Sequence, residues 1–292
     1  MKTCIRIALA FCCIAALSCD SGPGLAHTRY TAPVPVTATY DTAPSPALFD
    51  TAYRVIHVFV ALCDNKYQGI VPVPARIGNG QDPASNLYWV GYGVKSYFKS
   101  SKEWKFVQSR KTVPSKTTGN KDSLILEQAV FKHATKNWYL VADAYNGRYI
   151  RECTQDFLAS CAGLYKDTVQ LPDRAIGTSG NARMIAYIGH DGLMDFQLDN
   201  VYQCADGKTR DCIILACYSK SYFSEYIKSA NANPLLWTTH LMGPEAYTLH
   251  DALTGYLLHE SSEQVRTRAA SAYSKYTKCS LKAAKNLLVY GW

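Results

Sequence analysis

The amino-acid sequence predicts an α/β fold, with a doubly wound, mostly parallel central sheet and helices on both faces. Two observations support this class. Short, nearly continuous apolar runs recur along the chain, and such runs are typical of strands that are buried on both faces. Segments with the apolar period of a helix separate these runs, and strands alternating with helices indicate a parallel sheet. The apolar runs span residues 55–62, 138–142, 184–188, 212–216 and 235–238.

The helices are predicted from apolar residues that recur every three or four positions. Gly163 is a suitable stop for one of them, because glycine readily ends a helix. The polar segment 105–122 is predicted to form an exposed loop or a hairpin, since it contains proline and glycine. The expected helices span 87–98, 123–133, 149–161, 222–230 and 247–258.

The N-terminus has the pattern of an export signal. Two basic residues precede the apolar run 7–17, which is too short to span a membrane as a mature helix. Small residues and then Cys19 follow, so we expect a lipoprotein-type signal peptide over 1–18, with lipidation of Cys19. Ordinary cleavage after Ala26 is the alternative. The chain is therefore predicted to be exported, either lipid-anchored in the cell envelope or released as a periplasmic or secreted protein.

Three further regions follow the signal. Residues 19–48 are rich in proline, threonine and alanine, which predicts an extended linker. Residues 49–260 contain the alternating strands and helices and form the predicted α/β domain. Residues 261–292 are predicted to be a basic helical tail.

Composition and motif spacing exclude several classes of function. The 292 residues include 31 Lys and Arg against 23 Asp and Glu, a net charge of +8 without strong clustering, so no nucleic-acid partner is expected. Outside the N-terminus no apolar run is long enough to span a membrane, so membrane contact is expected only through the lipid anchor. The sequence has neither a CxxC pair nor an HExxH motif, and we expect no metal and no cofactor.

Seven cysteines lie beyond the signal region, an odd number that leaves at least one thiol unpaired. Cys204 and Cys212 flank a turn-like stretch, and we expect them to pair or to lie within reach of each other. Cys153 and Cys161 fall in one predicted helix, about 12 Å apart along its axis, so they cannot pair.

The candidate catalytic residues follow the ends of two predicted strands. The strand 184–188 runs into His190, and the strand 213–216 runs into Cys217. Neighbouring parallel strands would place both residues at one edge of the sheet, where ligands of open α/β sheets bind. A thiol beside an imidazole is a nucleophile with its proton acceptor. We expect this neighbour and the following helix N-terminus to lower the pKa of Cys217.

At these residues the sequence resembles the caspase-like superfamily of cysteine peptidases, which includes caspases, legumains, gingipains and separases. The matching stretches are Met184 to His190 and Ile213 to Cys217. The resemblance implies a central sheet with helices on both faces and a final antiparallel strand. It also implies an endopeptidase that takes a peptide or protein substrate.

The resemblance assigns a role to each site residue. Cys217 would attack the scissile carbonyl, and His190 would transfer its proton to the leaving amine. Backbone N–H groups near Gly192 and Cys217 would hold the oxyanion. The sequence departs from the family pattern at the expected oxyanion contact, because Asp191 separates His190 from Gly192. Asp191 is a possible orienter of His190.

Two alternatives stay open at this point. The chain could be a catalytically inactive caspase-like surface lipoprotein that acts as a binding or scaffold protein, which the inserted Asp191 favours. It could also be an unrelated α/β hydrolase, or an α/β domain in which Cys217 is a structural, buried thiol. The sequence does not indicate a cleavage-site preference.

Overall fold

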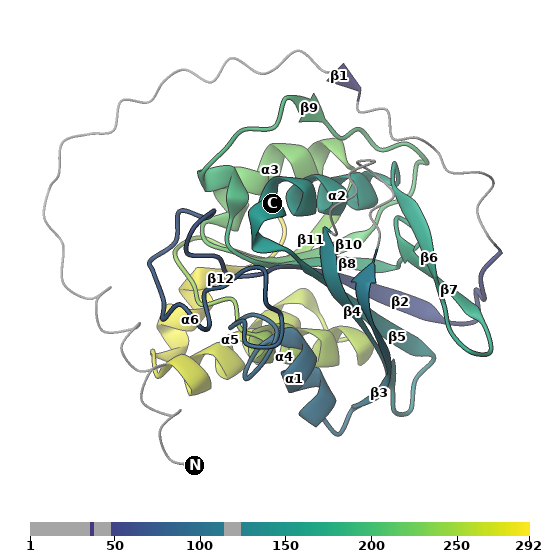
Figure 1. Ribbon diagram of the computed structural model, residues 1–292, viewed down its shortest axis with the longest axis horizontal. Coiled ribbons are helices and arrows are strands. Elements are labelled where there is room, and N and C mark those ends of the chain that lie inside the picture. Colours follow the sequence, from purple (N-terminus) through teal and green to yellow (C-terminus); the bar gives the residue numbers. More distant parts are fainter. Residues whose placement is uncertain (1–35, 38–47, 114–123) are drawn as a thin grey trace, which may run out of the picture.

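The computed structural model describes residues 48–113 and 124–292, together with the backbone of residues 36–37. An eight-stranded sheet crosses the centre in the order β12-β11-β10-β8-β2-β5-β4-β3 (Figure 1). The strands β11, β10, β8, β2 and β5 pair in parallel, whereas β12, β4 and β3 join by antiparallel pairing. The predicted α/β class with a mostly parallel central sheet is therefore confirmed.

The central strands are β2 (Arg54–Ala61), β3 (Trp104–Val113), β4 (Ile125–His133), β5 (Trp138–Tyr145), β8 (Met184–Gly189), β10 (Asp211–Leu215), β11 (Asn233–Thr238) and β12 (Leu288–Val289). Two small sheets accompany them. One pairs β6 (Lys166–Gln170) with β7 (Ala175–Ser179), and the other pairs β1 (Val36–Thr37) with β9 (Asn200–Val201).

The helices cover both faces of the sheet (Figure 1). They are α1 (Val94–Ser100), α2 (Ile150–Ala162), α3 (Ser219–Ser229), α4 (Ala246–Leu257), α5 (Ser262–Thr277) and α6 (Leu281–Leu287). The helices α2 and α3 pack on one face, and α1, α4 and α5 pack on the other.

Burial on both faces explains why the strands are apolar throughout. In β10, Ile213 and Leu215 pack into the core beside α4, whereas Cys212 and Ile214 pack into the core beside α2. Because successive side chains of a strand point to opposite faces, both sets must be apolar. All five predicted parallel strands are found, with their ends shifted by a few residues.

The predicted helix 123–133 is wrong, because residues Ile125–His133 form β4. The apolar positions that suggested a helix are four residues apart, and this spacing is also an even number, which keeps side chains on one face of a strand. Pairing with β5 and β3 decides between the two. β3 and β4 form the hairpin that was one of two options for 105–122, and residues 114–123 lie outside the described residues.

The predicted helix 87–98 is also largely wrong, because α1 begins only at Val94. Turns occupy the preceding residues, where Gly91 has φ +65° and a Cβ on Gly93 would collide with the backbone of Trp89. These two glycines therefore fit a turn and not a continuous helix. The other three predicted helices correspond to α2, α3 and α4, and Gly163 ends α2 in the left-handed conformation, as expected.

The C-terminal segment 261–292 is helical, as predicted, but it packs against the α/β domain. Val265, Ala269 and Ala270 of α5 are fully buried in the core that also contains β2. The final strand β12 then extends the central sheet beyond β11. This segment is therefore part of the same folded unit and not a separate tail.

Candidate functional site

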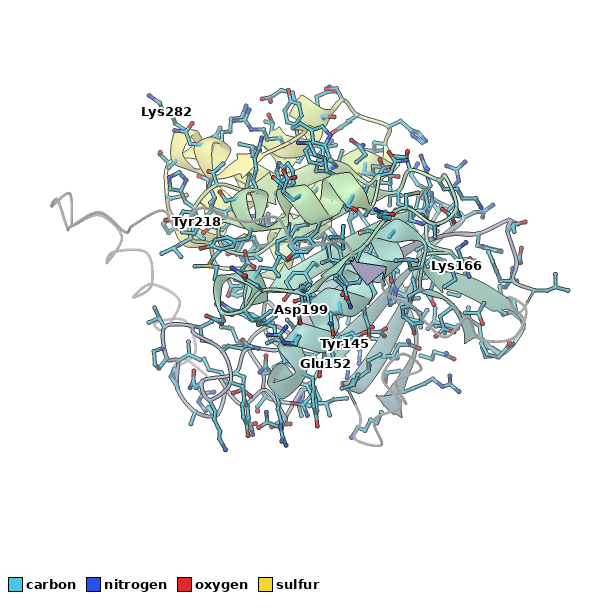
Figure 2. All side chains as sticks on the ribbon, turned by 90° about the horizontal axis from the view of Figure 1, so that it is seen from above. Tyr145, Glu152, Lys166, Asp199, Tyr218 and Lys282 are labelled. Atoms are coloured by element: carbon cyan, nitrogen blue, oxygen red, sulfur yellow. The ribbon has the colours of Figure 1, made fainter. Side chains whose placement is uncertain are left out.

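The loops that follow the parallel strands gather at one edge of the sheet, as parallel pairing requires. In the register of β8 and β10, Leu215 lies opposite Ile188. Cys217 and His190 each follow this pair by two residues, so both lie in the loops at this edge. Tyr218, the next residue, lies on the opposite side of the molecule from Lys166 of β6 (Figure 2).

Cys217 is partly buried between the end of β10 and the start of α3. Its Sγ accepts a hydrogen bond from the Met242 N–H at 3.4 Å, and the thiol can donate to the Met242 carbonyl oxygen at 3.6 Å. Tyr218 has φ +50°, a rare conformation for a residue other than glycine, and its N–H donates to the carbonyl oxygen of His240. The loop after β11 thus covers the thiol.

The expected lowering of the Cys217 pKa is wrong. Burial raises the pKa of this thiol, and the nearby carboxylate of Asp191 raises it further. The hydrogen bond with Met242 acts in the opposite direction but does not compensate for the lost hydration. The surroundings of Cys217 therefore favour the protonated thiol over the thiolate.

His190 is buried, and its ring is held by a carboxylate. His190 Nε2 lies 2.7 Å from Oδ2 of Asp195, and the same oxygen accepts the Gly69 N–H at 3.0 Å. A Cβ on Gly69 would lie 2.4 Å from Oδ1 of Asp195, so a larger residue here would have to displace this carboxylate. Within the described residues no hydrogen bond joins His190 to Cys217.

Asp191 does not orient His190, which corrects that expectation. Its Oδ1 accepts the Leu193 N–H at 2.9 Å and so caps the short 3₁₀ turn Gly192–Met194. The side chain is fully buried, and Oδ2 has no hydrogen-bond partner among the described residues. Burial is the main cause that raises the pKa of Asp191 to about 8, and the charge of Asp195 adds to it.

Gly192 is buried beneath an aromatic ring, since a Cβ there would lie 2.6 Å from the Phe196 ring. This packing fixes the turn that joins Asp191 to Asp195. The assignment of the Gly192 and Cys217 N–H groups to an oxyanion site stays a prediction.

Gly189, the residue before His190, is required by the fold, and replacing it with alanine is expected to destabilise the protein strongly. Its φ is +147°, and a Cβ would lie 2.5 Å from the carbonyl oxygen of Ala61. Strain and collision together should lower the free energy of unfolding by about 3 kcal/mol or more. Urea denaturation measures the change. Gly207→Ala, where φ is +68° but the space is open, should cost only about 1 kcal/mol; equal losses in the two variants would contradict this explanation.

The cysteines in the described part of the chain are all free. The predicted pairing of Cys204 with Cys212 is wrong for this structure, because Sγ of Cys204 is directed at the carbonyl oxygen of Lys208, 3.7 Å away. Cys153 and Cys161 both lie in α2 and are not bonded, as expected. Eight residues apart along one helix, the two cysteines are too distant from each other to bond.

Within the described ranges, no cluster of three or more His, Cys, Asp or Glu side chains is arranged to hold a metal ion. Over the same residues, no helix has the length and apolar character needed to cross a membrane. The predicted signal peptide 1–18, Cys19 and nearly all of the linker 19–48 lie outside the described residues. Comparison of the chain with family models, curated proteins and solved structures found no match.

One further side chain that interacts with Cys217, that of Tyr88, was not anticipated from the sequence. The buried Tyr88 hydroxyl forms a hydrogen bond with the Cys63 thiol and lies within the electrostatic reach of Cys217 and Glu245. Burial raises the pKa of Cys63 to about 12 and also raises the pKa of Glu245. Cys63 is therefore the less reactive of the two thiols near this edge, because the thiolate is the nucleophile.

Proposed function

We propose that this chain is an exported cysteine endopeptidase of the caspase-like type, in which Cys217 is the nucleophile and His190 the proton-transfer residue. The observation that supports the proposal is the parallel pairing of β8 with β10, because His190 and Cys217 both follow the carboxyl ends of these neighbouring strands. The antiparallel β12 next to β11 supports the same fold type. The loop after β11 contacts Cys217 through Met242, and the loop after β2 contacts Asp195, the partner of His190, through Gly69.

The thiol and the imidazole would act in sequence. As Cys217 Sγ bonds to the scissile carbonyl carbon, its proton moves to His190, and the carbonyl oxygen becomes the oxyanion. His190 then gives this proton to the leaving amine as the C–N bond breaks, which leaves an acyl-enzyme. A water molecule attacks the thioester carbonyl, His190 takes its proton, and transfer of that proton to Sγ releases the acid and restores the thiol.

Asp195 would fix the ring for this exchange. With the proton on Nε2 of His190, this N–H donates a hydrogen bond to Oδ2 of Asp195, and Nδ1 would be the acceptor for the thiol proton. The same oxygen is tied to Gly69 in the loop after β2, so that loop and the His190 ring are held together. Asp195 is in this account a positioning residue.

The thiol must leave the Met242 backbone before it attacks. Its two hydrogen bonds to Met242 keep it in a resting position, and its raised pKa keeps it protonated. Binding of a peptide over the loop after β11 would replace these contacts and bring Sγ toward the ring. Catalytic contacts are often long in unliganded enzymes and shorten in the complex.

A non-catalytic binding protein of the same fold is the second candidate function. The observations that favour it are the neutral Cys217 thiol and its bonding to Met242 and not to His190. In that case the carboxyl edge would bind a peptide or protein without cleaving it.

Hydrolysis of a quenched-fluorescence peptide library by the purified protein separates the two functions. If the protein is a peptidase, it should cleave peptides of the library. Cys217→Ala should abolish this cleavage, and Cys63→Ala should leave it intact. Binding of peptides without cleavage, in both the unchanged protein and Cys217→Ala, would establish the second candidate. Detergent partitioning of the full-length protein, lost in Cys19→Ala, tests the lipid anchor in the same preparations.

A further inference from the structure

A pair of buried thiols lies on the other side of the fold, between α2 and the start of β10. Cys161, near the end of α2, and Cys212, in β10, are both completely buried. Their thiols form a hydrogen bond with each other, and this contact together with burial raises the pKa of Cys212. The two sulfurs are therefore neighbours even though about 50 residues separate them in the chain.

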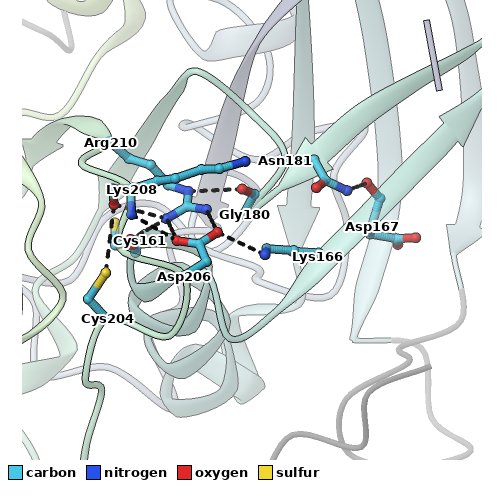
Figure 3. Close-up of polar contacts among 9 residues, drawn as sticks. All are labelled: Cys161, Lys166, Asp167, Gly180, Asn181, Cys204, Asp206, Lys208 and Arg210. Carbon is cyan, nitrogen blue, oxygen red and sulfur yellow. Dashed lines mark hydrogen bonds and ion pairs between the residues drawn. The ribbon is translucent and has the colours of Figure 1, made fainter. Parts of the chain in front are cut away.

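Polar contacts of Arg210 and Asp206 connect the end of α2 with the chain just before β10 (Figure 3). The buried guanidinium of Arg210 donates to the carbonyl oxygens of Cys161, at 3.4 Å, and Gly180, at 2.9 Å. Asp206 pairs with Arg210 at 2.6 Å and with Lys166 at 2.8 Å. The Arg210 side chain thus ties the end of α2 to the chain just two residues before Cys212.

The nearby backbone is fixed as well. The N–H of Ala205 donates to the carbonyl oxygen of Ala162 at 2.8 Å, and the N–H of Cys204 donates to Ser229 at 3.0 Å. The partly exposed Cys204 thiol is directed at the carbonyl oxygen of Lys208 (Figure 3). These contacts hold the end of α2 and the chain before β10 together on the side of the sheet where both thiols are buried.

We propose that Cys161 and Cys212 form a disulfide when the chain folds under oxidising conditions. The oxidant is a thiol disulfide such as oxidised glutathione. One cysteine thiolate attacks it to give a mixed disulfide and one reduced thiol, and the second cysteine then displaces the other reduced thiol. Two protons and two electrons pass from the cysteines to the oxidant. Since both sulfurs are fully buried in the folded chain, the bridge would form before burial is complete and then be protected from reduction.

The test begins with the full chain refolded in a glutathione buffer with excess oxidised form. Free thiols are blocked with N-ethylmaleimide during unfolding without reductant, and the digested peptides are analysed by mass spectrometry. We expect a linked peptide pair containing Cys161 and Cys212, which reductant separates. Reduction should also lower the melting temperature, by on the order of 10 °C for a loop of this length.

Matched variants make the result specific. Cys161→Ser and Cys212→Ser should each remove the linked peptide and the effect of reductant on the melting temperature. Cys153→Ser, at an equally buried position of α2, should retain both. Alkylation of all the cysteines without reductant would overturn the proposal, and so would a bridge between Cys204 and Cys212. Because no outcome depends on peptidase activity, failure here leaves the proposed function untouched.

Discussion

Replacing His190 with alanine is expected to lower kcat/KM for peptide hydrolysis by about three orders of magnitude. The neutral Cys217 thiol cannot attack without an acceptor for its proton, and the leaving amine cannot depart without a donor. Combining His190→Ala with Cys217→Ala should add little, because the two residues act as a unit. Steady-state kinetics with a fluorogenic peptide measures the loss.

The control for this prediction lies elsewhere in the chain. His259 is exposed at the end of α4, and His259→Ala should leave kcat/KM unchanged. Asp195→Asn should give an intermediate loss, about 10- to 100-fold, since it weakens the support of the ring but keeps the acceptor. A His190→Ala protein that is folded by circular dichroism and retains full activity would remove His190 from the mechanism.

Replacing Asp191 with asparagine is expected to stabilise the protein increasingly as the pH rises from about 4 to about 8. The folded chain keeps this carboxyl protonated up to a pKa of about 8, whereas the unfolded chain releases the proton near the ordinary value of 3.8. Between these values the folded state binds more protons than the unfolded state, so stability falls as the pH rises. Asparagine has no proton to release and therefore lacks this slope.

The size of the effect follows from the shift. Each pH unit between the two pKa values changes the stability by about 1.4 kcal/mol, so the advantage of Asp191→Asn should be up to about 4 kcal/mol larger at pH 8 than at pH 5. Urea denaturation at the two pH values measures it. Asp199→Asn, at an exposed position (Figure 2), should show no such difference. Parallel pH profiles for the unchanged protein and Asp191→Asn would mean that Asp191 is ionised in the folded state.

The parallel strands of the sheet could be predicted because a strand that is buried on both faces is apolar at nearly every position. The run 184–188 had to be apolar at every position to lie between two layers of helices. The antiparallel strand β4 could not be recognised in the same way, because its spacing of four fits both periods. Its pairing with β5, a contact with another segment, decides the structure.

Some residues of the candidate site could likewise be predicted from the sequence, and others could not. The positions of Cys217 and His190 follow from the strands that precede them, so the sequence predicts their common edge. Asp195 could not be found, since its contacts with His190 and Gly69 depend on how the turn after β8 folds back. The pKa of Cys217 was misjudged for a related reason. The direction of the pKa shift depends on how far the loop containing Met242 shields the thiol from water. The residues next to Cys217 in the sequence do not indicate this shielding.

Native-state labelling of the thiols tests the central proposal most directly. The folded protein is treated with a peptide that carries a thiol-directed electrophile, then digested and mapped by mass spectrometry. Cys217 should be labelled first, and the label should be lost in His190→Ala. Cys63 should stay unlabelled, because it is buried and its pKa is raised to about 12. Label on Cys63 or Cys279 with none on Cys217 would contradict the assignment of Cys217 as the nucleophile.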